Sequence, residues 1–265
     1  MAEETQYTAR TGMVQISTAN SSLSGSGTLG TLITGGANGT LIKTLLIKAI
    51  SNTSEGMIRL FLDDATGLNI RLLKEIYVPA VTKASISKAF ETRVELNFSL
   101  EAGYILRVST QNADTFNVIA EGLDWTYYSS RVRMDTTRYT TNNGSAVINT
   151  ANSGLDGSGT LGLAYTAGSS GTYKGSGVGS ITIKSSVSVS PGMIRLYLDN
   201  LTSKFCFQEI EVNTGTKSAT DGAFERTIVF DNNLNLQAGY KIQVSTQVAE
   251  SFHVFVQGND WNYYS

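Results

Sequence analysis

The chain contains the same unit twice, and this internal repeat limits its architecture more than any other feature. Residues 7–30 align with residues 139–162, and about 15 of these 24 positions are identical, including the strings TANS and GSGTLG. GMIRLFLD at residues 56–63 returns as GMIRLYLD at residues 192–199, and the similarity continues to the last residue. A unit of about 125 residues is far longer than the repeat of a solenoid or a propeller. The sequence therefore predicts two tandem homologous domains, each large enough to bury its own core.

The ends of the two copies divide the chain into four parts. Residues 7–129 form the first expected repeat and residues 139–265 the second. Between them lies the polar stretch SRVRMDTTR, residues 130–138, which has no counterpart inside the repeat and is typical of a linker. Residues 1–6 precede the first copy as an N-terminal arm.

Both copies have the composition and the pattern of β-strands. The chain is 41% hydrophobic and 16% charged, with 26 glycines and 2 prolines, and no window carries a sustained helical period with caps at both ends. We therefore predict an all-β chain of two tandem homologous antiparallel β-sandwich domains of the jelly-roll type. An immunoglobulin-like sandwich is the alternative, although the Cys-Trp-Cys pattern of antibody domains is absent. The segments expected to be strands in the first copy are Met13–Thr18, Leu29–Ile33, Ile42–Ile50, Met57–Asp63, Ile70–Pro79, Glu91–Phe98, Tyr104–Thr110 and Phe116–Tyr128.

Charge and cysteine usage argue against several classes of partner and site. With 20 basic and 22 acidic residues the net charge is −2, so the chain has no general positive field and we expect no nucleic-acid partner. It has no run of about 18 apolar residues, and its acidic start lacks the pattern of a secretory signal, so we expect no membrane partner and synthesis in a cytoplasm. Cys206 is the single cysteine, which permits no internal disulfide and no cysteine-based metal cluster.

The string GSGTLG, at residues 25–30 and again at 157–162, satisfies the G-x-G-x-x-G spacing of dinucleotide-binding proteins. That motif binds a pyrophosphate only when it opens a helix and is followed by an acidic residue about 20 positions later. Here a β-type, glycine-rich segment follows, and no Asp or Glu occurs between Gly30 and Glu55. We therefore interpret the run as a turn between two strands, and we expect no cofactor.

No set of residues in the sequence indicates catalysis. His253 is the single histidine and its repeat partner is Asn117, which argues against a symmetric catalytic triad or a two-histidine metal site. We expect His253 on the polar face of a strand and Cys206 as a buried structural thiol. Asp63 and Asp199 end the GMIRL(F/Y)LD strand, where we expect turn-forming hydrogen bonds, with a weakly bound Ca²⁺ as the alternative. The chain is accordingly predicted to have no enzymatic activity, no catalytic residue and no metal site.

Each copy ends in Gly-x-Asp-Trp-x-Tyr-Tyr-Ser, which places exposed aromatic residues near the end of a strand. Such side chains can anchor a protein interface, stack on sugar rings, or close the open end of a sandwich. We keep all three interpretations open. The candidate interface or glycan-stacking residues are Trp125, Tyr127, Tyr128, Trp261, Tyr263 and Tyr264.

Three longer strings carry a family resemblance: TANSSLSGSGTLGT, LIKTLLIKAISNTSEGMIRLFLDD and STQNADTFNVIAEGLDW. In these segments the chain resembles small β-sandwich proteins encoded beside capsid genes in tailed bacteriophages. The resemblance implies a virion structural protein, in particular an auxiliary or decoration protein of the head, with the major capsid protein or other virion proteins as partners. It implies location in the virion after synthesis in the host cytoplasm. Two fused copies also suit a symmetric lattice and a homo-oligomer.

Two other functions are compatible with the residues. The chain could itself be a small double jelly-roll major capsid protein. It could instead be a tandem carbohydrate-binding module displayed on a particle, with surface glycans as ligands of the strand-end aromatic residues.

Overall fold

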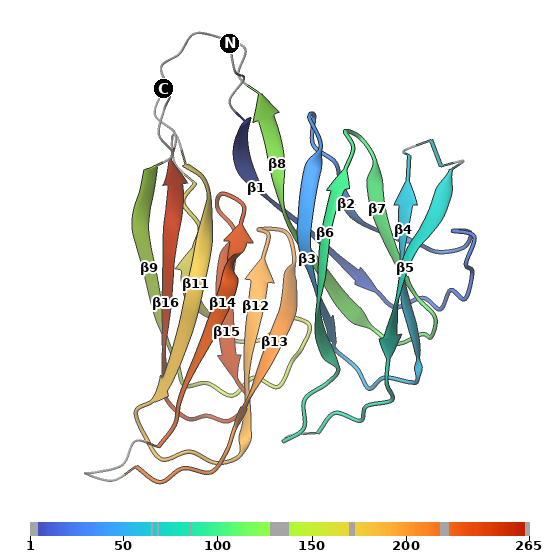
Figure 1. Cartoon of the computed structure of the whole chain (residues 1–265). Helices are drawn as coiled ribbons and strands as arrows, with labels where there is room; N and C mark the ends of the chain where they lie inside the picture. The colour runs from blue at the N-terminus through green and yellow to red at the C-terminus, as the bar shows by residue number, and fades with distance from the viewer. Residues whose placement is uncertain are drawn as a thin grey trace. The chain divides into compact units, whose positions relative to one another are not determined.

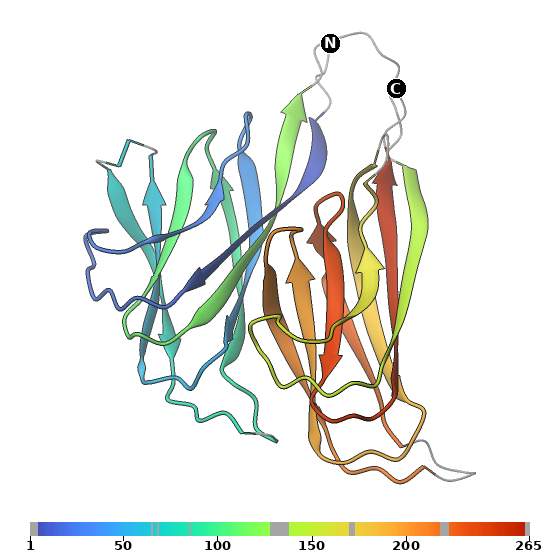
Figure 2. The same cartoon turned by 180° about the vertical axis from the view of Figure 1, so that it is seen from behind.

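The computed structural model describes residues 5–64, 66–67, 69–84, 86–127, 138–169, 173–217 and 223–262. These residues form strands and connecting loops, with no helix among them, so the all-β prediction is confirmed. The chain divides into two compact units, residues 1–83 with 89–130, and residues 84–88 with 131–265. In Figures 1 and 2 the strands of the first unit run from blue to green and those of the second from yellow-green to red.

The described residues of each unit form eight strands. The first contains β1 (Thr5–Ile16), β2 (Gly30–Thr34), β3 (Thr40–Ala49), β4 (Gly56–Asp63), β5 (Ile70–Val78), β6 (Glu91–Leu100), β7 (Ile105–Thr110) and β8 (Phe116–Tyr127). The second contains β9 (Arg138–Ile148), β10 (Gly162–Thr166), β11 (Tyr173–Ser185), β12 (Gly192–Asp199), β13 (Lys204–Val212), β14 (Glu225–Leu236), β15 (Lys241–Thr246) and β16 (Phe252–Asn262). All the strand segments expected in the first copy fall on β1 to β8.

The strands of each unit pair as one long antiparallel ribbon that is folded over on itself. In the first unit β1 pairs with β8, β2 with β7, β3 with β6 and β4 with β5. Further pairing of β8 with β3 and of β7 with β4 gives the sheets β1-β8-β3-β6 and β2-β7-β4-β5. The second unit repeats this order as β9-β16-β11-β14 and β10-β15-β12-β13. Eight strands in this arrangement form a jelly roll, which confirms that prediction for both copies against the immunoglobulin alternative.

The core of each unit lies between its two sheets, where alternate side chains of every strand point inward. The inward residues of β8 include Phe116 and Val118, both almost fully buried. An edge-to-face aromatic pair packs in each core: Phe90 with Phe116 at 6.4 Å, and Phe224 with Phe252 at 6.0 Å, between ring centroids. The two copies therefore use equivalent residues to fill equivalent space.

The two units also share irregularities of their sheets. The register of β3 shifts between Ile42 and Thr44, and that of β11 shifts between Val178 and Ser180. A second shift recurs at equivalent positions of β4 and β12. β-Bulges of this kind bend a strand and redirect its side chains, and they depend on the local sequence. The duplicated sequence therefore places the shifts at equivalent positions, although β14 has two more residues than β6 at the first of them.

The structure corrects the expected edges of the repeats. β1 begins at Thr5, not near Met13, because its backbone pairs with β8 from Thr5 opposite Tyr127 to Ile16 opposite Phe116. Thr5 and Gln6 therefore belong to a strand and not to an N-terminal arm. In the same way Arg138, the last residue of the expected linker, begins β9 by pairing with Asn262. Polar segments such as these become strands because a long partner offers backbone hydrogen bonds, which residue pattern alone does not reveal.

Candidate functional site

The two strand-end tryptophans are only partly open to solvent. Trp125 in β8 and Trp261 in β16 are both half-buried. The Trp125 backbone N–H donates to Gly39 O at 3.2 Å, and its ring lies so close to Gly39 that a Cβ added there would be 3.3 Å away. A Cβ added at Gly177 would likewise lie 3.5 Å from the Trp261 ring. Part of each indole therefore packs on its own unit, which supports the interpretation that these rings help to close the end of a sandwich. The Tyr127 side chain and residues Tyr128, Tyr263 and Tyr264 lie outside the described residues.

The aspartate that precedes each tryptophan organises the same end of its unit. Thr40 Oγ1 donates to Asp124 Oδ1 at 2.5 Å. In the second unit Asp260 Oδ1 accepts from the equivalent hydroxyl of Ser176 and from Asn142 Nδ2 at 2.9 Å. Carboxylates that accept several local hydrogen bonds hold turns and strand ends in place. Hydrogen bonds within each unit thus explain the repeated aspartate, and packing on the unit explains the repeated tryptophan in part.

The glycine run forms the loop between the first and second strands of each unit, and it closes around an asparagine of the TANS string. Asn20 Nδ2 donates to Ser26 O and Thr28 O, both at 2.9 Å, while Asn20 Oδ1 accepts from the Ser22 backbone N–H at 3.0 Å. The second unit repeats this with Asn152, which donates to Ser158 O and Thr160 O at 2.8 and 3.0 Å. The loop closes on a side-chain amide and leads into a strand, so the turn interpretation is confirmed.

A buried arginine ties this loop to the sheet beneath it. Arg59, the arginine of GMIRL, donates from Nη1 to Asn20 O at 3.3 Å and from Nε to Glu75 Oε1 at 2.8 Å. In the second unit Arg195 makes the same contacts, to Asn152 O at 3.1 Å and to Glu209 Oε1 at 3.0 Å. The strongest repeated strings, TANS, GSGTLG and GMIRL, therefore meet in one polar network in each unit. A network with its members satisfied in this way rigidifies a fold.

Replacing Gly27 or Gly159 with alanine should destabilise its unit by about 1–2 kcal/mol, because both glycines lie in the left-handed region and an alanine there is strained. Their φ angles are +80° and +75°. An added Cβ would also lie 3.0 Å from Asn20 Nδ2 or 2.9 Å from Asn152 Nδ2, inside the network. Urea denaturation followed by tryptophan fluorescence measures the loss. Thr28→Ala is the control, since it keeps the Thr28 carbonyl that Asn20 binds, and an equal loss in that variant would contradict the explanation.

The carboxylates at the end of the fourth strand accept turn hydrogen bonds, as the sequence predicts. Asp199 Oδ1 accepts from the Leu201 backbone N–H at 2.7 Å, and Asp63 Oδ1 accepts from the Gly67 backbone N–H at 3.4 Å. Asp63 Oδ2 also accepts from Arg107 Nε in the adjacent strand β7 at 2.5 Å. Hydrogen bonds from Thr66 and Asn69 hold the pKa of the neighbouring Asp64 below its usual range. Within the described part of the chain no three His, Cys, Asp or Glu side chains gather as metal ligands would.

The single cysteine and the single histidine lie where the pattern predicts. Cys206, in β13, is fully buried, which confirms a structural thiol. His253, in β16, alternates with the buried Phe252 and Val254 and lies on the outer side of its sheet. Its ring stacks on Phe255 with centroids 6.5 Å apart and planes 14° apart. His253 thus belongs to a surface and not to the core.

Sequence reasoning missed Glu121, a buried carboxylate in β8. It is only 1% exposed, and burial raises its pKa to about 7, although Thr44 Oγ1 donates to Oε2 at 2.7 Å and Arg93 Nη2 lies 3.5 Å from the same atom. The Oε1 atom has no hydrogen-bond partner among the described residues. The available signal was a difference between the copies, because the equivalent residue in the second unit is Gln257, which is exposed.

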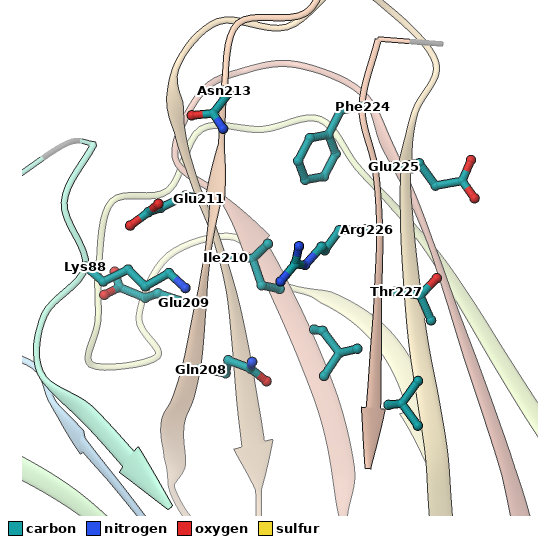
Figure 3. A pocket seen from close by; sticks show the side chains of 12 residues that line it. Lys88, Gln208, Glu209, Ile210, Glu211, Asn213, Phe224, Glu225, Arg226 and Thr227 are labelled. Atoms are coloured by element: carbon teal, nitrogen blue, oxygen red, sulfur yellow. The ribbon is translucent and has the colours of Figure 1, made fainter. Parts of the chain in front are cut away.

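A groove of about 550 Å³ lies in the second unit between β13 and β14 (Figure 3). These are the outermost strands of the two sheets, so the groove is the open edge of the sandwich. Glu211 from β13 and Arg226 and Thr227 from β14 are among its lining residues. Carboxylate and guanidinium groups occur side by side in this lining, which favours neither an anion nor a cation.

Comparison with known proteins identifies no family. No family model matches the chain, and no curated protein matches it. Among solved structures it is similar to the N-terminal CBM22-1-CBM22-2 tandem domain of Xyn10C from Paenibacillus barcinonensis, at 12% identity and a TM-score of 0.27, over 96% of this chain and 92% of that chain. It is also similar to a peptide-N(4)-(N-acetyl-β-D-glucosaminyl) asparagine amidase, at 10% identity and 0.25, over 92% and 96%.

A third similar structure is the major capsid protein P2 from bacteriophage PM2, at 10% identity and a TM-score of 0.21, over 97% of this chain and 98% of that chain. Likeness at these scores carries no argument about function. No helix among the described residues is long and apolar enough to cross a membrane.

Proposed function

We propose that this chain is a structural component of a bacteriophage virion, specifically an auxiliary or decoration protein that binds the head shell through its sandwich surfaces. The observation that supports this most is that each repeat is a complete jelly roll of the same topology. Jelly rolls are a common architecture of viral capsid domains and of lectins. This is an argument from the fold, and the sequence resemblance to capsid-associated phage proteins directs it towards the virion.

The use of the repeated residues also supports a structural role. In both units the asparagine of TANS binds loop carbonyls, and the arginine of GMIRL binds the carbonyl of that asparagine and a glutamate of the adjacent strand. Residues employed in this way stabilise a scaffold. We propose accordingly that the protein has no enzymatic activity and acts through surface contacts with virion proteins, including other copies of itself.

Purified virions provide the test. We expect the protein to remain with intact particles through density-gradient purification, at a constant ratio to the major capsid protein across preparations. A fixed ratio is expected because a lattice offers a fixed number of equivalent sites. Absence from purified particles would contradict the proposal, and a copy number equal to that of the shell protein itself would favour the double jelly-roll capsid alternative.

The strand-end tryptophans distinguish a shell contact from sugar binding. Trp125→Ala and Trp261→Ala should lower incorporation into particles if the indoles contact the shell, because aromatic residues carry much of an interface's energy. Tyr77→Ala is the matched control, since Tyr77 is an aromatic residue of β5 that is 54% exposed. Unchanged incorporation with lost retention on immobilised glycans would favour the carbohydrate-binding alternative.

A further inference from the structure

One sheet of the second unit presents a broad outer face to solvent. In β9-β16-β11-β14, the strand registers align Ser145, Phe255, Thr182 and Thr227 in one row across the four strands. We call the outward side chains of this sheet, centred on that row, the outer face. Val147 and Val229 belong to the rows on either side. Because side chains alternate along a strand, all of these residues point away from the core.

The outer face exposes apolar side chains in neighbouring rows. Phe255 is 47% exposed, Val147 54% and Val229 67%. His253 stacks on Phe255 and extends its flat aromatic surface. Val147 lies in the strand next to that of Phe255 and Val229 lies two strands away, so exposed apolar side chains occur from one edge strand of the face to the other.

The duplication shows that this face has lost charge relative to its sister. The sheet registers make Val229 equivalent to Glu95 and Thr227 equivalent to Arg93 in the first unit. Gln257 likewise occupies the position of Glu121, although that carboxyl is buried in the first unit. Depletion of charged residues distinguishes the centre of a protein interface from the remaining surface.

The two charges that remain near the centre of the outer face compensate one another. Lys184 Nζ lies 3.1 Å from Glu225 Oε2 in the adjacent strand, and both side chains are more than half exposed. A pair of opposite charges next to the central row lets two copies of this region meet without a net like charge at that point.

We propose that the outer face docks on the outer face of a second copy of this chain, sheet against sheet, in a two-fold symmetric dimer. An isologous contact of this kind needs one self-complementary patch. The 11 residues of β16 and the four strands of the sheet span an area of about 700 Å², close to the roughly 800 Å² per partner of a standard interface. The face of a sheet suits a second sheet better than a small ligand, which favours a concave site.

The choice of a second copy rests on the proposed function, in which many copies act together, whereas the face itself rests on exposure and charge. Sedimentation velocity of the purified full chain, over about 1 to 100 μM, tests the dimer directly. We expect a concentration-dependent monomer–dimer equilibrium. Val229→Glu, which installs the residue of the sister face, should raise the dimer dissociation constant about tenfold or more.

Leu163→Glu is the matched control, because Leu163 is 50% exposed but lies in β10 of the other sheet. It should leave the equilibrium unchanged. Phe255→Ser provides a second variant on the face, and circular dichroism confirms that each variant is folded. A wild-type protein that stays monomeric throughout, a Val229→Glu variant that dimerises normally, or a Leu163→Glu variant that is equally weakened would each overturn the proposal.

Further results distinguish the proposed dimer from glycan binding and from the proposed virion function. A monomeric wild-type protein that binds a neutral polysaccharide through Phe255 would replace the second copy with a glycan as the occupant of the face. A monomer that still remains with virions at a fixed ratio would overturn the dimer and leave the proposed function standing. A protein that dimerises through this face but is absent from virions would support the dimer and contradict the proposed function.

Discussion

Replacing Glu121 with glutamine is expected to raise the free energy of unfolding of the first unit by about 3 kcal/mol at pH 8 and to leave it nearly unchanged at pH 4. The Glu121 carboxyl is buried, and burial raises its pKa to about 7 in the folded protein. The unfolded chain has an ordinary glutamate pKa near 4.5. Folding therefore favours the protonated acid.

The sign follows from this difference. A carboxyl whose folded pKa is raised contributes its full stability below the unfolded pKa and loses it as the pH rises through the folded pKa. The loss accumulates between about pH 4.5 and pH 7, at about 1.4 kcal/mol for each pKa unit. Glutamine carries no charge at any of these pH values, so the variant should not show the loss. The chain itself uses glutamine at the equivalent position, Gln257.

Urea denaturation at several pH values measures the effect. The chain has two tryptophans, one in each repeat, so a Trp261→Phe background makes the fluorescence report on Trp125 in the first unit. Gln257→Glu, in a Trp125→Phe background, is the matched control and should change stability little, because Gln257 is exposed. Equal stability of wild type and Glu121→Gln at pH 8 would contradict the assignment of a buried, raised-pKa carboxyl.

Replacing Gly144 with alanine is expected to destabilise the second unit by about 3 kcal/mol, because the strands β9 and β10 approach each other too closely for a side chain. A Cβ at Gly144 would lie 2.0 Å from Ala164 O, and the equivalent Cβ at Gly12 would lie 2.2 Å from Leu32 O. Backbone atoms cannot move aside as a flexible side chain can, so the strands themselves must separate. Gly12→Ala should accordingly have the same effect on the first unit.

Gly239→Ala is the control for the general cost of removing a glycine. Gly239 has a φ of +81°, but a Cβ there would meet its nearest atoms at 3.5 Å, an ordinary contact distance. Its loss should be about 1 kcal/mol, from backbone strain alone. Denaturation in a Trp125→Phe background, where Trp261 reports on the second unit, compares the two variants. If Gly144→Ala cost no more than Gly239→Ala, the close approach would not limit this site.

Features that depend on neighbouring residues were predictable from the sequence, and features that depend on pairing were not. The turn at GSGTLG and the turn at Asp199 follow from local glycine, asparagine and aspartate chemistry, and both are confirmed. The start of β1 was missed, since Thr5 becomes a strand residue only through its partner Tyr127 in β8. Trp125 and Trp261 lie on the strands expected for them, but pattern alone did not show that Gly39 lies beneath Trp125.

By itself the sequence determined that this protein is two copies of one β domain, because a duplication and an alternating pattern of apolar residues are properties of residue order. Only the tertiary structure decided whether equivalent residues of the two copies are buried or exposed. Glu121 and Gln257 occupy equivalent strand positions, yet one is buried and the other exposed. Glu95 and Val229 are equivalent too. Val229 is 67% exposed, which is less usual for a valine than for a glutamate. Burial is set by what packs over a side chain, and those neighbours come from distant parts of the chain.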